Sequence, residues 1–156
     1  LIIISKIINN LGKIVIFYIF LILVMSNKIL IIGKEAIIIS ALQAKLSADS
    51  FEIITHNGIS EANEIILFIK LNKPDYIIQA IGIFGKKEFS LLKNIKYDNI
   101  VRAIPIFLIT NSLASKDKLK FENLGIDYFF NKNDYGMDAL VEKIKKIIEN
   151  HPKKSI

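Results

Sequence analysis

The chain has 156 residues, of which 52% are hydrophobic, and a formal net charge of +6. This length fits one domain with a substantial apolar core, and the hydrophobic content argues against intrinsic disorder. The absence of cysteine excludes disulfides, thiolate nucleophiles and Cys-based zinc sites, and two histidines are too few for a histidine-rich metal centre. The basic residues are scattered lysines and one arginine, Arg102, and Asp117 interrupts the candidate cluster (Lys116, Lys118, Lys120), so direct nucleic-acid binding is not expected.

Residues 1–24 differ in composition from the rest of the chain. Their only charged side chains are Lys6 and Lys13, and twelve uninterrupted apolar residues run from Ile14 to Met25. A run of this length is shorter than the roughly 18 residues of a membrane-spanning helix. Three interpretations stay open: a non-native extension upstream of a start at Met25, a membrane tether, or a cleaved signal peptide.

From Lys28 onward, short apolar runs alternate with segments of helical spacing. The runs are rich in Ile and Phe, which is typical of parallel strands buried on both faces. These predicted strands lie at residues 29–32, 51–55, 76–81, 106–110 and 128–130.

The segments after each run carry apolar residues at a helical period. The positions are Ile38, Leu42 and Leu46; Ala62, Ile65, Ile66 and Ile69; Phe89, Leu92 and Ile95; Leu119, Phe121 and Leu124, which are less regular; and Leu140, Val141, Ile144, Ile147 and Ile148. Pro74 should end the second helix, and Gly125 suits the position after the fourth. Because each connection can hold a helix, the strands should be parallel with helices on both faces. We predict an α/β domain over residues 25–150, with a single doubly wound five-stranded sheet of the (βα)5 type, and a polar tail at 151–156.

Five short motifs, in the right order, resemble those of response-regulator receiver domains. They are Asn57-Gly58 with Glu61-Ala62; Lys73-Pro74-Asp75; Gly85 with Phe89 to Leu92; Ile104-Pro105-Ile106 through Thr110; and Gly125 through Lys132. The resemblance covers residues 27–150. It implies a flavodoxin-like (CheY-like) three-layer sandwich and a role in two-component signalling or a related regulatory system.

The resemblance also assigns a role to individual positions. Receivers hold Mg²⁺ with an acidic pair after the first strand, and here Gly33 and Lys34 occupy those places. The phospho-accepting aspartate at the end of the third strand corresponds to Ala80, while Thr110 and Lys132 match the residues that contact the phosphoryl group. An alanine methyl cannot accept a phosphoryl group, and glycine and lysine side chains offer Mg²⁺ no oxygen ligand. We therefore expect a degenerate pocket with no catalysis, no metal and no cofactor.

The expected function is that of a phosphorylation-independent pseudo-receiver, cytoplasmic unless residues 1–24 are retained and attach it to a membrane. Phe129 falls at the switch aromatic of the family, and Asn133 stands where the family usually has a cis proline. The module would act through a protein partner or its own dimer. The resemblance places the contact face on the fourth helix, fifth strand and fifth helix, including Lys118, Phe121, Tyr128 and Lys145.

Two alternative functions remain open from the sequence. Lys34 and Lys132 are expected to point into one crevice without an opposing carboxylate, which would favour a bound anion and a small anionic ligand sensor. A membrane-tethered adaptor is the other, should residues 1–24 be retained. Glu35 is expected to begin the first helix near its positive dipole end, and His56 to be a loop residue rather than a base or ligand.

Overall fold

The computed structural model describes residues 10–18, 26–49, 51–82, 84–111, 114–126 and 128–150. Residues 10–18 form a short helix with exposed side chains. Within these ranges no helix has both the length and the apolar character needed to cross a bilayer. The polar tail at 151–156 and most of the apolar segment 1–24 lie outside the described residues, so the interpretations of both ends stay predictions.

The domain is built on one sheet of five parallel strands in the order β2-β1-β3-β4-β5. The strands are β1 (Lys28–Gly33), β2 (Glu52–His56), β3 (Tyr76–Ile81), β4 (Ile106–Thr110) and β5 (Tyr128–Asn131). Each boundary lies within one residue of the predicted one. The predicted doubly wound, five-stranded α/β fold is confirmed.

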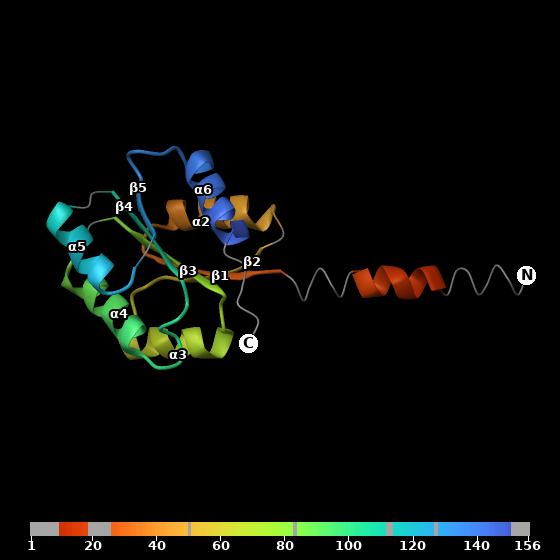
Figure 1. The fold of residues 1–156 in the computed structure, drawn as a ribbon, viewed down its shortest axis with the longest axis horizontal. Helices are drawn as coiled ribbons and strands as arrows, with labels where there is room; N and C mark the ends of the chain where they lie inside the picture. Colours follow the sequence, from red (N-terminus) through yellow and green to blue (C-terminus); the bar gives the residue numbers. More distant parts are fainter. Residues whose placement is uncertain are drawn as a thin grey trace, which may run out of the picture.

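Helices cover both faces of this sheet (Figure 1). They are α2 (Ala36–Ser47), α3 (Ala62–Asn72), α4 (Lys86–Tyr97), α5 (Ser115–Asn123) and α6 (Met137–Asn150). Helices α2 and α6 pack on one face, and α3, α4 and α5 pack on the other. The chain therefore forms the expected three layers, with the sheet in the middle.

Side-chain alternation along the strands divides the apolar core in two. Ile29 and Ile31 point toward α2 and α6, whereas Leu30 and Ile32 point toward α3, α4 and α5, and all four are fully buried. Because the central strands are covered on both faces, their sequences are continuous apolar runs rather than alternating ones. In α5 the apolar positions do not share one face, since Leu119 is exposed.

Two helix ends take a left-handed residue, where the chain must reverse. Gly125 follows α5 with φ of +77°, as its position predicted. After α3, Lys73 adopts φ of +47° directly before Pro74, and its backbone N–H donates to the Ile69 carbonyl at 2.8 Å. Among the described residues Lys73 is the only non-glycine residue with positive φ. This conformation is sterically unfavourable for lysine because of its Cβ atom, which glycine lacks.

Candidate functional site

The ends of β1 and β3 mark the point where the order of the sheet reverses. The chain leaves β1 toward β2 on one side, and it leaves β3 toward β4 on the other. Open α/β sheets bind ligands outside the carboxyl ends of such strands. A cavity of about 620 Å³ lies there, between the strand ends and the first turns of α3 and α4. Gly33, Lys34 and Ala80 all line it, so three of the predicted site residues do come together.

Gly33 and Ala80 are register partners on β1 and β3. A Cβ atom on Gly33 would lie 2.8 Å from the carbonyl oxygen of Ala80 and 3.2 Å from its Cβ. Side-chain carbons do not approach backbone atoms this closely, so any larger residue at position 33 requires the two strands to shift. The close packing of β1 and β3 therefore leaves no room for a side chain at position 33, where the resemblance would place the first acid of the Mg²⁺ pair.

Lys34 is held by Glu88 in the first turn of α4. Its Nζ lies 3.0 Å from Glu88 Oε1. The Glu88 carboxylate also accepts the backbone N–H of Gly85, the residue that precedes α4, as the acidic member of a capping box does. Burial raises the pKa of Glu88, but the hydrogen bonds from Lys34 and the backbone N–H groups outweigh burial and leave that pKa below its ordinary value.

Lys132, which follows β5, forms an ion pair with Glu35, which follows β1. Its Nζ lies 3.2 Å from each carboxylate oxygen, and the Lys132 side chain is only 12% exposed. Glu35 stands at the N-cap of α2, as predicted, but its carboxylate does not bond to the helix. It lies instead over Gly82, where a Cβ atom would collide with it.

These two ion pairs correct the expectation of a cationic crevice. Lys34 and Lys132 both have an opposing carboxylate, which comes from a helix start distant in sequence. Lys132 does not line the cavity. The lining holds two ammonium groups, Lys34 and Lys87, and three carboxylates, Glu35, Glu61 and Glu88. The cavity lining thus has a formal charge of 2 − 3 = −1. The premise of the anion-binding interpretation, that Lys34 and Lys132 lack opposing carboxylates, is wrong.

The resemblance to receiver domains implies a Mg²⁺ site, and the residues present do not fit one. Mg²⁺ takes oxygen ligands in octahedral geometry, usually including one or two carboxylates. Gly33 and Lys34 supply none, and the carboxylates of Glu35 and Glu88 are each engaged by a lysine. Across the described part of the chain, no three His, Asp or Glu side chains are placed to share a metal ion.

The remaining residues of the predicted pocket lie beside the ends of β4 and β5. Thr110 is the buried last residue of β4, and its carbonyl accepts the backbone N–H of Lys132 at 2.8 Å. Asn133 donates through Nδ2 to the Asn111 carbonyl at 2.7 Å, and no peptide bond between described residues is cis. Phe129 is half-buried against the core. The two loops are therefore tied together without the usual proline.

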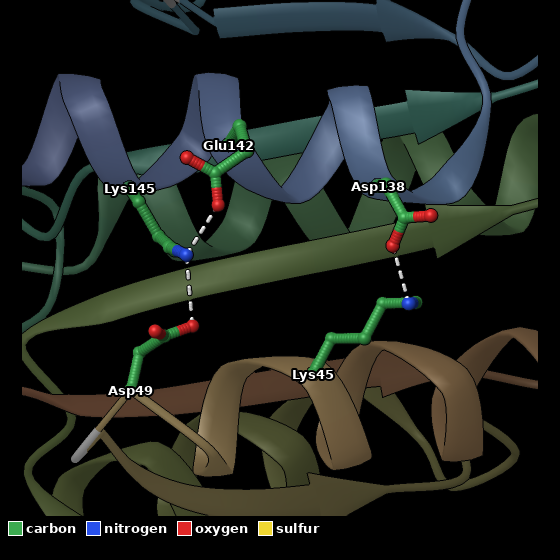
Figure 2. A network of polar contacts seen from close by, with 5 residues as sticks. All are labelled: Lys45, Asp49, Asp138, Glu142 and Lys145. Carbon is green, nitrogen blue, oxygen red and sulfur yellow. Dashed lines mark hydrogen bonds and ion pairs between the residues drawn. The ribbon is translucent and has the colours of Figure 1, made fainter.

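Two of the four residues assigned to the partner face lie elsewhere. Phe121 is fully buried, with its ring centroid 4.6 Å from that of Phe84 and 5.9 Å from that of Phe129. Lys145 faces α2, where it pairs with Asp49 at 2.9 Å (Figure 2). Lys118 is exposed and Tyr128 is half-buried. The resemblance could not separate these cases, because it located elements rather than side-chain directions.

The sequence did not predict Lys87, Glu88 or Gln79 as residues of this site. Gln79 lies in β3, is 4% exposed and lines the cavity. Its Oε1 is buried without a hydrogen-bond partner among the described residues. The signal in the sequence is a single polar residue within an otherwise apolar strand.

Solved structures share this fold. The chemotaxis response regulator CheY4 of Vibrio cholerae matches with a TM-score of 0.65 and 16% identity, over 78% of this chain and 98% of that one. The receiver domain of a signal transduction histidine kinase from Syntrophus aciditrophicus matches with a TM-score of 0.66 and 21% identity, over 84% and 96%. A putative response regulator from Chloroflexus aurantiacus gives 0.64 and 19%, over 80% and 98%.

At these identities the likeness shows the receiver-domain fold. No protein-family model matches the chain, and no curated protein matches it either. The resemblance inferred from five short motifs is thus confirmed at the level of three-dimensional structure.

Proposed function

We propose that the chain is a pseudo-receiver, a signalling module that acts through protein contacts and not through phosphorylation of its own pocket. The observation that carries this proposal is the pairing of Gly33 with Ala80 at the ends of β1 and β3. Neither side chain has an oxygen, and the strands pack too closely at position 33 to admit one. Without a carboxylate nucleophile at residue 80, no acyl phosphate can form there.

The ion pairs of the site support the same proposal. In a receiver pocket, the lysine that corresponds to Lys132 contacts the phosphoryl group. Here Glu35 supplies a permanent negative charge to that lysine from within the chain. A lysine already satisfied by a neighbouring carboxylate has little left to gain from an incoming phosphate, and the phosphate would meet three carboxylates in the lining.

Phosphorylation is tested with acetyl phosphate and Mg²⁺, followed by intact-mass measurement of the whole chain. We expect no added phosphoryl group. The Ala80→Asp variant restores only the nucleophile, and it should also stay unlabelled because no acidic pair is present to hold Mg²⁺. The cyanobacterial phytochrome response regulator RcpA, which has been solved in its phosphorylated form, is treated in parallel as the reference receiver. Mg²⁺-dependent labelling of the unaltered chain would refute the proposal.

The contact face of the proposed module is the outer surface of α5 with the adjoining β5. Lys118 and Leu119 are exposed there, whereas the half-buried Tyr128 packs on the α2 and α6 side of the sheet. An exposed leucine beside an exposed lysine offers both an apolar and a charged contact to a partner protein or a second copy. Lys145 and Phe121 are no longer part of this face.

The face is tested by size-exclusion chromatography of the chain alone and by binding to a purified partner once crosslinking has identified it. Leu119→Ser with Lys118→Glu should weaken the complex or dimer at least tenfold. Ile37→Ser with Lys93→Glu is the matched control, because both side chains are exposed and lie on other helices. Equal effects of the two double variants would place the contact elsewhere.

A further inference from the structure

The strongest unexplained feature of the domain is the carboxamide of Gln79 at the base of the cavity. A buried carbonyl oxygen without a donor is unfavourable, and the great majority of such groups in native proteins have a partner. Gln79 faces the α3 and α4 side of the sheet, between Ile77 and Ile81 of the same strand. Ile77 and Ile81 beside it offer no donor, and the cavity that Gln79 lines has room for one.

The cavity is large enough to supply one. Its volume of about 620 Å³ falls in the range of small-molecule sites, and it stands at the switch point of the sheet. Ile65, Ile81 and Leu91 give it an apolar wall, and three glycines, Gly33, Gly58 and Gly82, bring backbone close to its interior. Such a site would bury an apolar body and select its orientation with a few polar groups.

The charges in the lining determine what kind of molecule fits. Lys34 is paired with Glu88, and Lys87 donates to the Ile59 carbonyl at 2.9 Å. The ammonium groups are therefore engaged, and Glu61 adds a further negative charge to the lining. An anion would meet a net repulsive site. An uncharged molecule leaves these pairs intact.

We propose that this cavity binds an uncharged, largely apolar molecule whose N–H group donates to Oε1 of Gln79. The apolar part of the molecule packs against the wall formed by Ile65, Ile81 and Leu91. Since Oε1 is covered in this structure, the donor reaches it after rotation about the last torsion of the side chain, which is a soft degree of freedom in glutamine. The proposed ligand makes the module a sensor of a small neutral compound, independently of whether its pocket can be phosphorylated.

The test uses the full chain with four probes that are uncharged and carry an N–H group at neutral pH: adenine, uracil, nicotinamide and indole. The sequence contains two glutamines, Gln43 and Gln79, so selective ¹⁵N labelling of glutamine gives two side-chain carboxamide signals. At least one probe should shift the Gln79 signal saturably and leave that of Gln43, exposed on α2, unchanged. 1-Methylindole, which lacks the donor, should bind about tenfold more weakly than indole if indole is the probe that binds.

Two pairs of variants locate the site. Gln79→Leu should weaken the best probe about tenfold, whereas the matched Gln43→Leu should leave its affinity unchanged. Ala62→Phe fills the cavity from the start of α3 without altering Gln79, and it should abolish binding even if Gln79→Leu folds poorly. Affinity for these variants is read from the backbone amides of Gly33 and Gly82.

Three results would overturn the proposal. They are no Gln79 shift with any of the four probes, a shift with inorganic phosphate alone, or binding that Ala62→Phe does not affect. The first would leave a buried water as the donor to Gln79. None of these outcomes bears on labelling by acetyl phosphate, so the ligand site and the pseudo-receiver function can fail separately.

Discussion

Lys132 and Glu35 form an ion pair that joins two ends of the domain 97 positions apart in sequence. Lys132 follows β5 and Glu35 directly precedes α2, so the contact links the start of α2 to the end of β5. The ammonium is nearly covered, and both carboxylate oxygens lie 3.2 Å from it. The pair therefore gives the Lys132 ammonium a permanent partner within the domain.

The first prediction concerns this pair. Glu35→Gln keeps the shape of the side chain but leaves the Lys132 ammonium with a neutral partner. Because Lys132 is mostly buried and Glu35 partly exposed, the free energy of unfolding should fall by about 1 kcal/mol, more than for a surface pair and less than for a fully buried one. Urea unfolding at neutral pH measures it.

Glu52→Gln is the matched control, since it breaks the more exposed ion pair with Lys28, whose atoms lie 2.9 Å apart. It should change the free energy of unfolding by no more than about 0.5 kcal/mol. An equal loss in the free energy of unfolding for both variants would mean that the Glu35–Lys132 pair stabilises the fold no more than an exposed pair does.

The second prediction concerns the left-handed lysine after α3. Lys73→Gly relieves the steric cost of φ at +47° but adds flexibility to the unfolded chain, and the net effect should be a gain of about 0.5 kcal/mol in the free energy of unfolding. Lys93→Gly, at an exposed position inside α4, should instead lose about 1 kcal/mol. Thermal and urea unfolding of both variants provide the comparison, and the same sign for both would contradict the prediction.

The strands and helices could be read from the sequence because each obeys one local rule. The strand at 76–81 is apolar throughout, since helices cover both of its faces, and Val141 to Ile148 repeat at the helical period on a single face. Pro74 and Gly125 then set where helices stop. These signals act over a few residues, so one sequence is enough to locate them.

The contacts of the candidate site could not be read in the same way. Glu88 reaches Lys34 across 54 positions, and Glu35 reaches Lys132 across 97. Spacing along the chain carries no information about which carboxylate a lysine will meet. The burial of Phe121 was equally hidden, because α5 has too few apolar residues to show which side faces the core. Family resemblance placed the elements but not these side chains.

The third prediction concerns pH and His56. Burial lowers the pKa of His56 below 6.5, although the nearby Glu64 charge opposes the shift, and the imidazole Nδ1 accepts the backbone N–H of Gly58 at 3.0 Å. The neutral form is thus the native one. Its contribution to stability is complete above pH about 6.5 and is lost as the pH falls through the lower folded pKa.

Urea unfolding between pH 7.5 and pH 5 should therefore show a decline in the free energy of unfolding that His56→Gln reduces. His151→Gln replaces the other histidine of the chain and should leave the decline unchanged. This pH range lies above the ordinary pKa of Glu88, so loss of the Lys34 contact does not contribute to it. An unaltered slope in His56→Gln would show that another group is responsible.

The fourth prediction separates Lys145 from Lys118. Hydrogen bonds from Lys145 to Glu142 and Asp49 raise its pKa to about 12, and its side chain is 17% exposed against 56% for Lys118. Figure 2 shows Lys145 between α6 and the end of α2, with the Lys45–Asp138 pair beside it. Lys145→Ala should lower the denaturant midpoint and loosen α2, whereas Lys118→Ala should leave stability unchanged and affect only binding. Hydrogen exchange of the α2 amides measures this difference. Equal protection of α2 in the two variants would mean that Lys145 does not stabilise the packing of α2.

The last prediction concerns the cost of Gln79 in the absence of a ligand. Its Oε1 is buried without a partner among the described residues, and replacement of such a group by an apolar one of similar shape removes that cost. Gln79→Leu should raise the free energy of unfolding by about 1 kcal/mol, while Gln43→Leu, made on the exposed side of α2, should change it by less than about 0.5 kcal/mol. Urea unfolding of the purified chain without added compounds measures both. A loss of stability in Gln79→Leu would mean that the carboxamide is already satisfied, and the case for a donor in the cavity would then fall with it.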